Sequence, residues 1–297
     1  MARVAGLGFY WLDARSRHTA LDNLRAVYGE SMTLSERKRL ARASAMHFTL
    51  TFFDLFWARH LTKDTVGRWY EFENLETIQR LHAEGGVIGV CMHFGQYELA
   101  AHTLGFQGIL ATMIARDFKN PALTDLMTQA REVSGHRIVP REGALRRLIG
   151  ALREGRSVGI VVDLALKMHE GGFPMDCLGL KLNATSIHGA LHRKTGRPVV
   201  PITSEPLPGG RWLVRVHDPL LLPMDSSADT IAQSIWDFFE PIVRARPELW
   251  LWCYRHFRYY PEGESERYPS YAHGAEEWDR KIALRDEDKR VRPDPAK

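Results

Sequence analysis

Between residues 85 and 245, short apolar runs alternate with longer segments of helical periodicity. The apolar runs are typical of buried strands and are expected at 87–90, 108–115, 137–140, 157–162, 199–203 and 212–216. The helical patterns between and after them lie at 97–104, 121–134, 144–154, 187–195 and 230–245. This alternation predicts an α/β fold in which a mostly parallel central sheet is flanked by helices.

The first 84 residues are expected to form an N-terminal helical, membrane-associating segment that precedes the sheet. Thr33 and Glu36 have the spacing of a capping box, which opens a helix, and few helix-breaking residues follow before Leu61. Apolar residues between 46 and 57 are too dense to fit one narrow stripe. This helix therefore packs against the main domain, or it partly enters a lipid interface or lines an acyl channel.

Composition excludes several classes of protein. The net charge of +4 over 297 residues is too small to indicate nucleic-acid binding. The three cysteines cannot form a full disulfide framework and lack the spacing of metal ligands, so we expect a reducing compartment. No segment reaches the roughly 18–20 uninterrupted apolar residues that span a bilayer, and the N-terminus does not read as a secretory signal. Contact with a membrane, if it occurs, is therefore expected at its surface.

The sharpest local motif is His93-Phe-Gly-Gln-Tyr-Glu98, which directly follows a predicted strand and opens a predicted helix. A carboxylate in this position can hold one imidazole nitrogen through a charge-assisted hydrogen bond. The other nitrogen is then free to accept a proton from an incoming hydroxyl. Gly95 leaves room where a substrate carbonyl could lie. By itself this spacing also fits a structural histidine with a nearby surface glutamate.

The motif resembles the H-x4-(D/E) motif of glycerolipid-type acyltransferases, and the wider chain is similar to the lipid A biosynthesis (lauroyl/myristoyl) acyltransferase family. The resemblance covers about residues 15–262. In order along the chain, the segments that carry it are 23–28, 34–41, 93–98, Ile114-Ala-Arg-Asp-Phe-Lys-Asn-Pro121, 178–185 and Pro247-Glu-Leu-Trp-Leu-Trp252 with Arg255 and Phe257. The resemblance implies a glycerolipid acyltransferase-like fold, with 85–268 as its α/β acyltransferase core.

The resemblance also implies roles for individual residues. His93 matches the general base and Glu98 the carboxylate that orients it. Arg116 matches an arginine near the site, which would bind a phosphate or stabilise charge. Asp163 follows an apolar strand and would orient Arg116, bind an acceptor hydroxyl or cap a helix. The remaining substrate-binding candidates are Gly95, Asn120 and Thr185, of which the last two are expected mainly to cap helices.

The implied reaction moves an acyl chain from acyl carrier protein or acyl-CoA to a hydroxyl of a membrane glycolipid, on the cytoplasmic face of the inner membrane. Neither a metal nor a cofactor is implied. The family commonly has Asp-Gln where this chain has Asp163-Leu164, and histidine where it has Tyr254. These departures leave open whether the acceptor is a lipid A precursor, another glycolipid or a lysophospholipid. Two alternatives remain: a thioesterase or lipid hydrolase using the same residues, and a membrane-associated binding protein without activity.

The last part of the chain, 269–297, is expected to be a charged tail. Between Glu276 and Arg290, 11 of 15 residues are charged. Such a segment is typical of a solvated helix or of a disordered tail.

Overall fold

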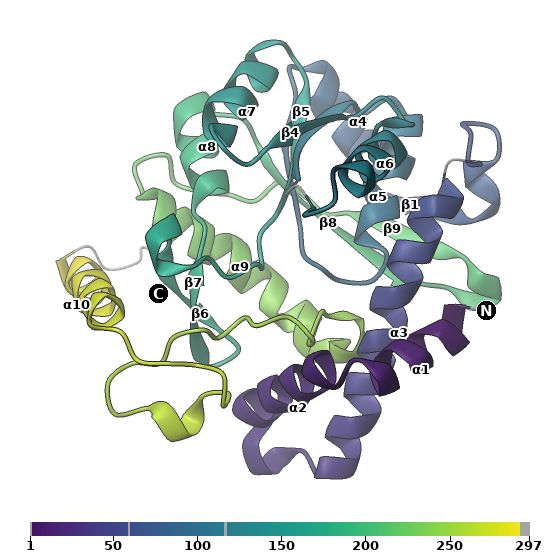
Figure 1. Ribbon diagram of the computed structural model, residues 1–297. Coiled ribbons are helices and arrows are strands. Elements are labelled where there is room, and N and C mark those ends of the chain that lie inside the picture. The colour runs from purple at the N-terminus through teal and green to yellow at the C-terminus, as the bar shows by residue number, and fades with distance from the viewer. Residues whose placement is uncertain (1, 59, 116–117, 292–297) are drawn as a thin grey trace.

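The computed structural model describes residues 2–58, 60–115 and 118–291, which form an α/β fold around a seven-stranded sheet (Figure 1). The strands of this sheet are β1 (Tyr70–Glu73), β2 (Ile88–Cys91), β3 (Ala111–Ala115), β4 (Arg137–Pro140), β5 (Ser157–Val161), β8 (Val199–Pro206) and β9 (Trp212–Val216). Their spatial order is β1-β9-β8-β2-β5-β3-β4. From β8 to β4 every pair is parallel, whereas β9 runs antiparallel to β8 and β1 runs parallel to β9. The predicted α/β fold with a mostly parallel sheet is confirmed.

Three strands were not expected from the sequence. β1 has only four residues and lies at the edge of the sheet, so it carries no long apolar run. β6 (Phe173–Cys177) and β7 (Leu180–Ala184) form a separate antiparallel hairpin. The turn between them is made by Leu178 and Gly179 with φ of 54° and 84°. Both central residues at positive φ give the twist that a two-residue hairpin turn requires, although leucine is an unusual residue for it.

Helices cover both faces of the sheet. They are α1 (Ala2–Leu12), α2 (Ala14–Tyr28), α3 (Leu34–Ala58), α4 (Leu75–Ala83), α5 (Tyr97–Phe106), α6 (Pro121–Glu132), α7 (Ala144–Arg153), α8 (Ile187–Thr195), α9 (Ala228–Ala245) and α10 (Glu276–Val291). Buried side chains of α7, α8 and α9 pack on one face together with Ile88 and Val90 of β2. On the other face α4, α5, α6 and the end of α3 pack with Val200 and Val214. Two apolar cores thus hold the sheet between helical layers.

The long helix α3 begins at the capping box that the sequence predicts. The backbone N–H of Thr33 donates to Glu36 Oε2 at 2.8 Å, and the Glu36 N–H donates to Thr33 Oγ1 at 3.3 Å. In its middle α3 reaches the C-terminal part of the chain, because Ser44 Oγ donates to the carbonyl oxygen of Trp250 at 2.5 Å. The helix therefore lies beside the segment that follows α9.

The charged stretch near the C-terminus is helical, which is one of the two predicted forms. α10 is anchored by Trp278, whose side chain is fully buried and whose ring centroid lies 5.8 Å from that of Tyr259. Lys281 Nζ also donates to the carbonyl oxygen of Gly172 at 3.2 Å. Trp278 and the hydrogen bond from Lys281 thus hold a helix whose composition alone gave no sign of burial.

Candidate active site

His93 and Asp163 meet at the carboxyl edge of the sheet because their strands are neighbours. β2 and β5 are parallel, and Cys91 is the register partner of Val161. His93 and Asp163 each follow two residues later, so both leave the sheet at the same level. The carboxyl edge of a parallel sheet is the usual place for a ligand site in α/β proteins.

Asp163 binds His93 through two hydrogen bonds. His93 Nδ1 lies 2.7 Å from Asp163 Oδ1, and the backbone N–H of His93 donates to Oδ2 at 3.0 Å. The indole Nε1–H of Trp250 donates to the same Oδ2 at 2.7 Å. Since a carboxylate only accepts, His93 carries its proton on Nδ1 and keeps an unprotonated Nε2. The His93 side chain is 13% exposed and that of Asp163 is fully buried, so only the imidazole can reach a substrate.

The surroundings of Asp163 keep it ionised. Burial alone would raise the pKa of this carboxyl group, but attraction to His93 in its protonated form and the hydrogen bonds from His93 and Trp250 outweigh burial and hold the pKa below its ordinary value. A buried carboxylate that stays negative can stabilise a positive charge on the adjacent imidazole. The pair therefore has the form of a general base with its orienting carboxylate.

Glu98 has a different partner from the one expected. Its carboxylate accepts two hydrogen bonds from Arg131, at 2.6 Å from Nη2 and 3.0 Å from Nε. Glu98 lies in the first turn of α5 and Arg131 in the last turn of α6, so the pair ties these two helices together. The expectation that Glu98 orients His93 is thus corrected: Asp163 makes the hydrogen bonds to the histidine.

We expect Glu98→Gln to affect stability more than chemistry. The substitution removes a charge from a bidentate pair that is mostly buried, which is expected to lower the free energy of unfolding by about 1–3 kcal/mol. Acyl transfer by the folded variant should stay within about tenfold of wild type. Denaturant unfolding and steady-state rates check both numbers. Glu154→Gln, in an ion pair whose side chains are 55% and 61% exposed, is the matched control and should change stability by less than about 0.5 kcal/mol. A loss of transfer by orders of magnitude in folded Glu98→Gln would restore Glu98 to the catalytic step.

A narrow crevice lies beside His93. Its walls include Phe48 and Thr51 of α3, Tyr97 of α5 and Leu251, and its volume is about 10 Å³. This volume holds about one water molecule. The Tyr97 ring packs edge-on against the imidazole with centroids 4.7 Å apart. The catalytic candidate is therefore accessible, but no acyl-sized cavity lies next to it in this crevice.

Gly95 is needed for packing. Its φ is +58°, and a Cβ atom there would lie 1.9 Å from the carbonyl oxygen of Ser204. Its N–H donates to the Leu249 carbonyl oxygen at 2.9 Å. The space left by the missing side chain is thus occupied by β8 backbone, whereas the sequence led us to expect a substrate carbonyl there.

The other predicted residues are found at helix starts or lie outside the described ranges. Asn120 Oδ1 accepts from the Ala122 N–H at 3.0 Å and caps α6, and Thr185 Oγ1 accepts from the Ile187 N–H at 3.3 Å before α8. Both capping roles agree with the sequence prediction. Arg116 is outside the described residues.

Two residues of the site were missed. Trp250 lies in a segment that the resemblance includes, but an indole gave no reason to expect a hydrogen bond to Asp163. His256 stacks on Trp250 with ring centroids 4.2 Å apart and an interplanar angle of 18°, and its Nδ1 is 3.1 Å from the Asp163 carbonyl oxygen. Burial lowers the pKa of His256. The dense aromatic composition of 247–257 was the available signal.

Two kinds of feature are absent from the described residues. They contain no group of three or more histidine, cysteine, aspartate or glutamate side chains that could hold a metal ion. None of their helices is long and apolar enough to cross a membrane.

Comparison with known proteins gives consistent matches. A sequence model of bacterial lipid A biosynthesis acyltransferases matches residues 2–259. The lipid A biosynthesis lauroyltransferase of Escherichia coli (strain K12) is 29% identical over 214 residues, which cover 68% of this chain and 66% of that protein. The palmitoleoyltransferase of the same organism is 24% identical over 262 residues, 86% of this chain and 82% of that protein. A lipid A biosynthesis acyltransferase of Shigella flexneri matches equally, at 24% identity over 262 residues.

The sequence resemblance stated above is therefore confirmed by a match that extends over most of the chain. The arrangement of His93 at the carboxyl edge of a mostly parallel sheet agrees with it. The chain belongs to the bacterial lipid A biosynthesis acyltransferase family.

Proposed function

We propose that this protein moves a fatty acyl chain from a thioester donor to a hydroxyl of a membrane glycolipid, most directly a lipid A precursor. The observation that carries the proposal is the 2.7 Å contact between His93 Nδ1 and the buried carboxylate of Asp163, which leaves Nε2 of a neutral imidazole as the proton acceptor. Relatives named lauroyltransferase and palmitoleoyltransferase support the choice of acceptor. The donor is an acyl carrier protein or an acyl-CoA.

The chemistry follows from the geometry of the pair. Nε2 of His93 takes the proton of the acceptor hydroxyl while its oxygen attacks the thioester carbonyl carbon, so that a C–O bond forms. The tetrahedral intermediate collapses, the C–S bond breaks, and the leaving thiolate takes the proton back from the imidazolium. Asp163 stabilises the imidazolium between these two transfers. Arg116 remains the proposed group for phosphate binding or for charge stabilisation.

The experiment that tests this function supplies a labelled acyl thioester with and without a lipid acceptor. Transfer of the label to the acceptor, with little free fatty acid in its absence, is the expected result. Free fatty acid as the main product, independent of acceptor, would instead identify a hydrolase. Running acyl carrier protein and CoA thioesters in parallel identifies the donor.

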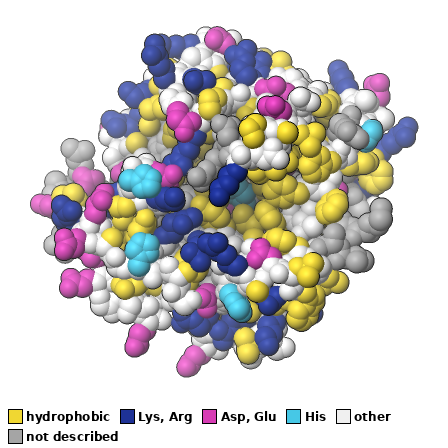
Figure 2. All heavy atoms as spheres, viewed as in Figure 1, with side chains coloured by type: hydrophobic (Ala, Val, Ile, Leu, Met, Phe, Trp, Pro, Cys, Tyr) yellow, Lys and Arg dark blue, Asp and Glu magenta, His cyan; other side chains and the backbone are white. Residues whose placement is uncertain are grey.

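Exposed aromatic side chains on and beside α3 support peripheral attachment to a membrane, which we propose is the cytoplasmic face of the inner membrane. Phe53 is 53% exposed and Trp57 37%, and one helical turn separates them, so they share a face of α3. The Trp57 ring packs against Trp69, itself 40% exposed. Figure 2 shows hydrophobic side chains gathered over the region of α3 and the neighbouring α5 and α6. Such a patch fits the interface of a lipid bilayer.

We expect the double substitution Phe53→Ser and Trp57→Ser to weaken vesicle binding by at least about tenfold, because each buried aromatic contributes roughly 1.5–3 kcal/mol of transfer free energy. Sedimentation with anionic phospholipid vesicles measures the partition. Leu221→Ser is the control, since Leu221 is 99% exposed and does not belong to α3. The preceding residue, Leu220, donates its backbone N–H to the carbonyl oxygen of Val199, the first residue of β8. Equal sedimentation of both variants would contradict membrane contact through α3.

A further inference from the structure

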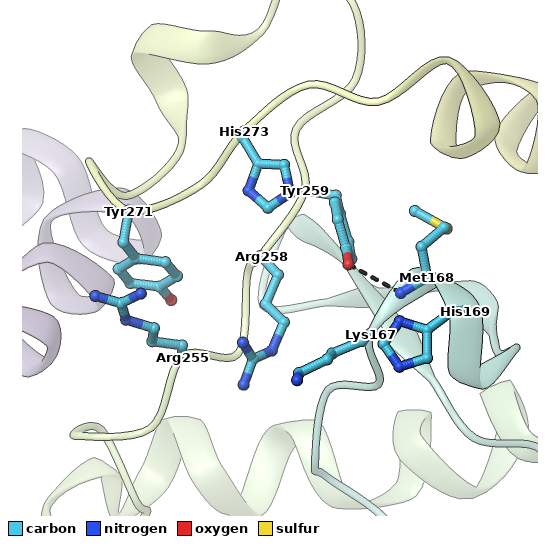
Figure 3. Close-up of a pocket in the computed structure, with 8 residues that line it drawn as sticks. All are labelled: Lys167, Met168, His169, Arg255, Arg258, Tyr259, Tyr271 and His273. Atoms are coloured by element: carbon cyan, nitrogen blue, oxygen red, sulfur yellow. Dashed lines mark hydrogen bonds between the residues drawn. The ribbon is translucent and has the colours of Figure 1, made fainter.

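A second cavity, of about 280 Å³, lies outside the crevice at His93 (Figure 3). One wall is the segment after β5, with Lys167, Met168 and His169, and the other is the C-terminal segment after α9. Eight residues line it: Lys167, Met168, His169, Arg255, Arg258, Tyr259, Tyr271 and His273. The volume is close to the roughly 300 Å³ at which small-ligand sites begin.

The cavity gathers cations that no carboxylate neutralises. Lys167, Arg255 and Arg258 all line it, and none of them takes part in an ion pair among the described residues. Nε of Arg258 is buried without a hydrogen-bond partner. Buried donors of this kind ordinarily have partners, and a donor among three cations that are unpaired within the described residues favours an anionic ligand.

Aromatic side chains hold the arginines in position. The Arg255 guanidinium lies 5.1 Å from the centroid of the Tyr271 ring, and Arg258 Nη2 donates to the Tyr254 hydroxyl at 3.2 Å. Figure 3 shows Lys167 and Arg258 extending toward one another across the cavity. A guanidinium that is already oriented loses little freedom on binding and suits the oxygens of a phosphate.

The two walls continue directly from the residues that hold the base. Lys167 follows Asp163 by four residues, so their Cα atoms are at most about 14 Å apart. Arg255 follows Trp250 by five residues, and the next residue, His256, has its Nδ1 3.1 Å from the Asp163 carbonyl oxygen. The Tyr254 hydroxyl donates to the carbonyl oxygen of Ala165 at 3.1 Å and joins the two segments. The cavity and the reacting group therefore belong to one connected piece of structure.

We propose that this cavity binds a phosphate group carried by one of the two substrates and so positions that substrate relative to His93. The inference rests on the proposed acyl transfer, because it assigns the phosphate to a reactant. Lys167 and Arg255 supply positive charge from the lining, and Arg258 supplies the buried Nε–H donor. The phosphate belongs either to the glycolipid acceptor or to the phosphopantetheine arm of the donor, and these share the same recognition chemistry.

Direct binding is tested without turnover, by the ³¹P NMR line width of inorganic phosphate titrated with the protein at constant ionic strength. Wild type is expected to broaden the signal, and the double variant Lys167→Gln, Arg255→Gln should weaken binding by about tenfold or more. Arg153→Gln is the control. Arg153 is exposed at the end of α7, just before the amino-terminal end of β5, whereas Lys167 follows the carboxyl-terminal end of that strand. Equal broadening by wild type and the double variant overturns the phosphate site, whether or not the protein transfers acyl chains.

Steady-state kinetics then assign the phosphate. If the acceptor carries it, the double variant raises KM for a phosphorylated glycolipid by about tenfold or more and leaves KM for its dephosphorylated form unchanged. If the donor carries it, the same contrast appears between acyl-phosphopantetheine and acyl-pantetheine. In either case kcat at saturation should remain near wild type, because the base is untouched. Unchanged KM for all four substrates overturns the assignment to a reactant. Absence of turnover in wild type would instead refute the proposed function and leave the phosphate titration to decide this site.

Discussion

The substitution His93→Ala is expected to lower kcat/KM for acyl transfer by about 10²- to 10⁴-fold, the range that a positioned general base contributes. The Asp163 carboxylate cannot take the place of Nε2, because its side chain is fully buried. The fold should persist, since the imidazole is partly exposed and the backbone N–H of residue 93 still donates to Asp163. The measurements are initial rates with saturating donor and thermal unfolding of the same preparations.

His18→Ala is the matched control for this change, because His18 is exposed on α2 and far along the chain from the base. It should have wild-type rates and stability. If His93→Ala turned over at the wild-type rate, the base would have to be another residue and the mechanism given above would be wrong.

Asp163→Asn is expected to reduce transfer by about 10⁴-fold, comparable to the loss of orienting carboxylates in other acid–base sites. Asparagine has the same shape, but its amide can donate to Nδ1 of His93. The imidazole would then carry its proton on Nε2, where it cannot accept one from a hydroxyl. The oxygen of the amide still accepts from Trp250, so the packing of the site is retained.

Asp163→Asn is also expected to change how the stability of the fold depends on pH. The pKa of Asp163 is lower in the folded protein than its ordinary value, so the carboxylate stabilises the fold above that value and the contribution is lost as the pH falls through the folded-state pKa. Asp163→Asn should lack this part of the acid dependence below about pH 4. Urea titrations at several pH values measure it. Retained activity in folded Asp163→Asn, together with a large loss in Glu98→Gln, would reverse the assignment made from the hydrogen bonds.

Chain order explains what the sequence could and could not predict. Alternating apolar and helical segments define a parallel α/β sheet, and His93 is visible because it follows a strand. Its partner depends on which strands are neighbours, and β5 lies beside β2 although two strands come between them in the chain. Glu98, five residues from His93, is close in sequence but extends from α5 toward Arg131. Local spacing therefore suggested the wrong carboxylate, while Asp163 was recognised with a different role.

The strand β1 and the role of Trp250 could not be predicted for the same reason, because both depend on contacts between segments that are far apart in the chain. A four-residue edge strand has too few apolar positions to show a period, and only its pairing with β9 makes it a strand. Trp250 is separated from Asp163 by 87 residues, so their hydrogen bond depends on how distant parts of the chain pack. Long-range contacts of this kind leave no pattern in a single sequence.

The hydrogen bond from Trp250 to Asp163 has a consequence for the synthesis of the protein. The indole that donates to this carboxylate lies in the last fifth of the 297 residues. A polypeptide still emerging from the ribosome, or one cut before this tryptophan, has the histidine and the aspartate but lacks the donor that helps keep the acid ionised. We therefore expect the chain to become active only late in its synthesis, and copies that end before Trp250 to transfer acyl chains more slowly.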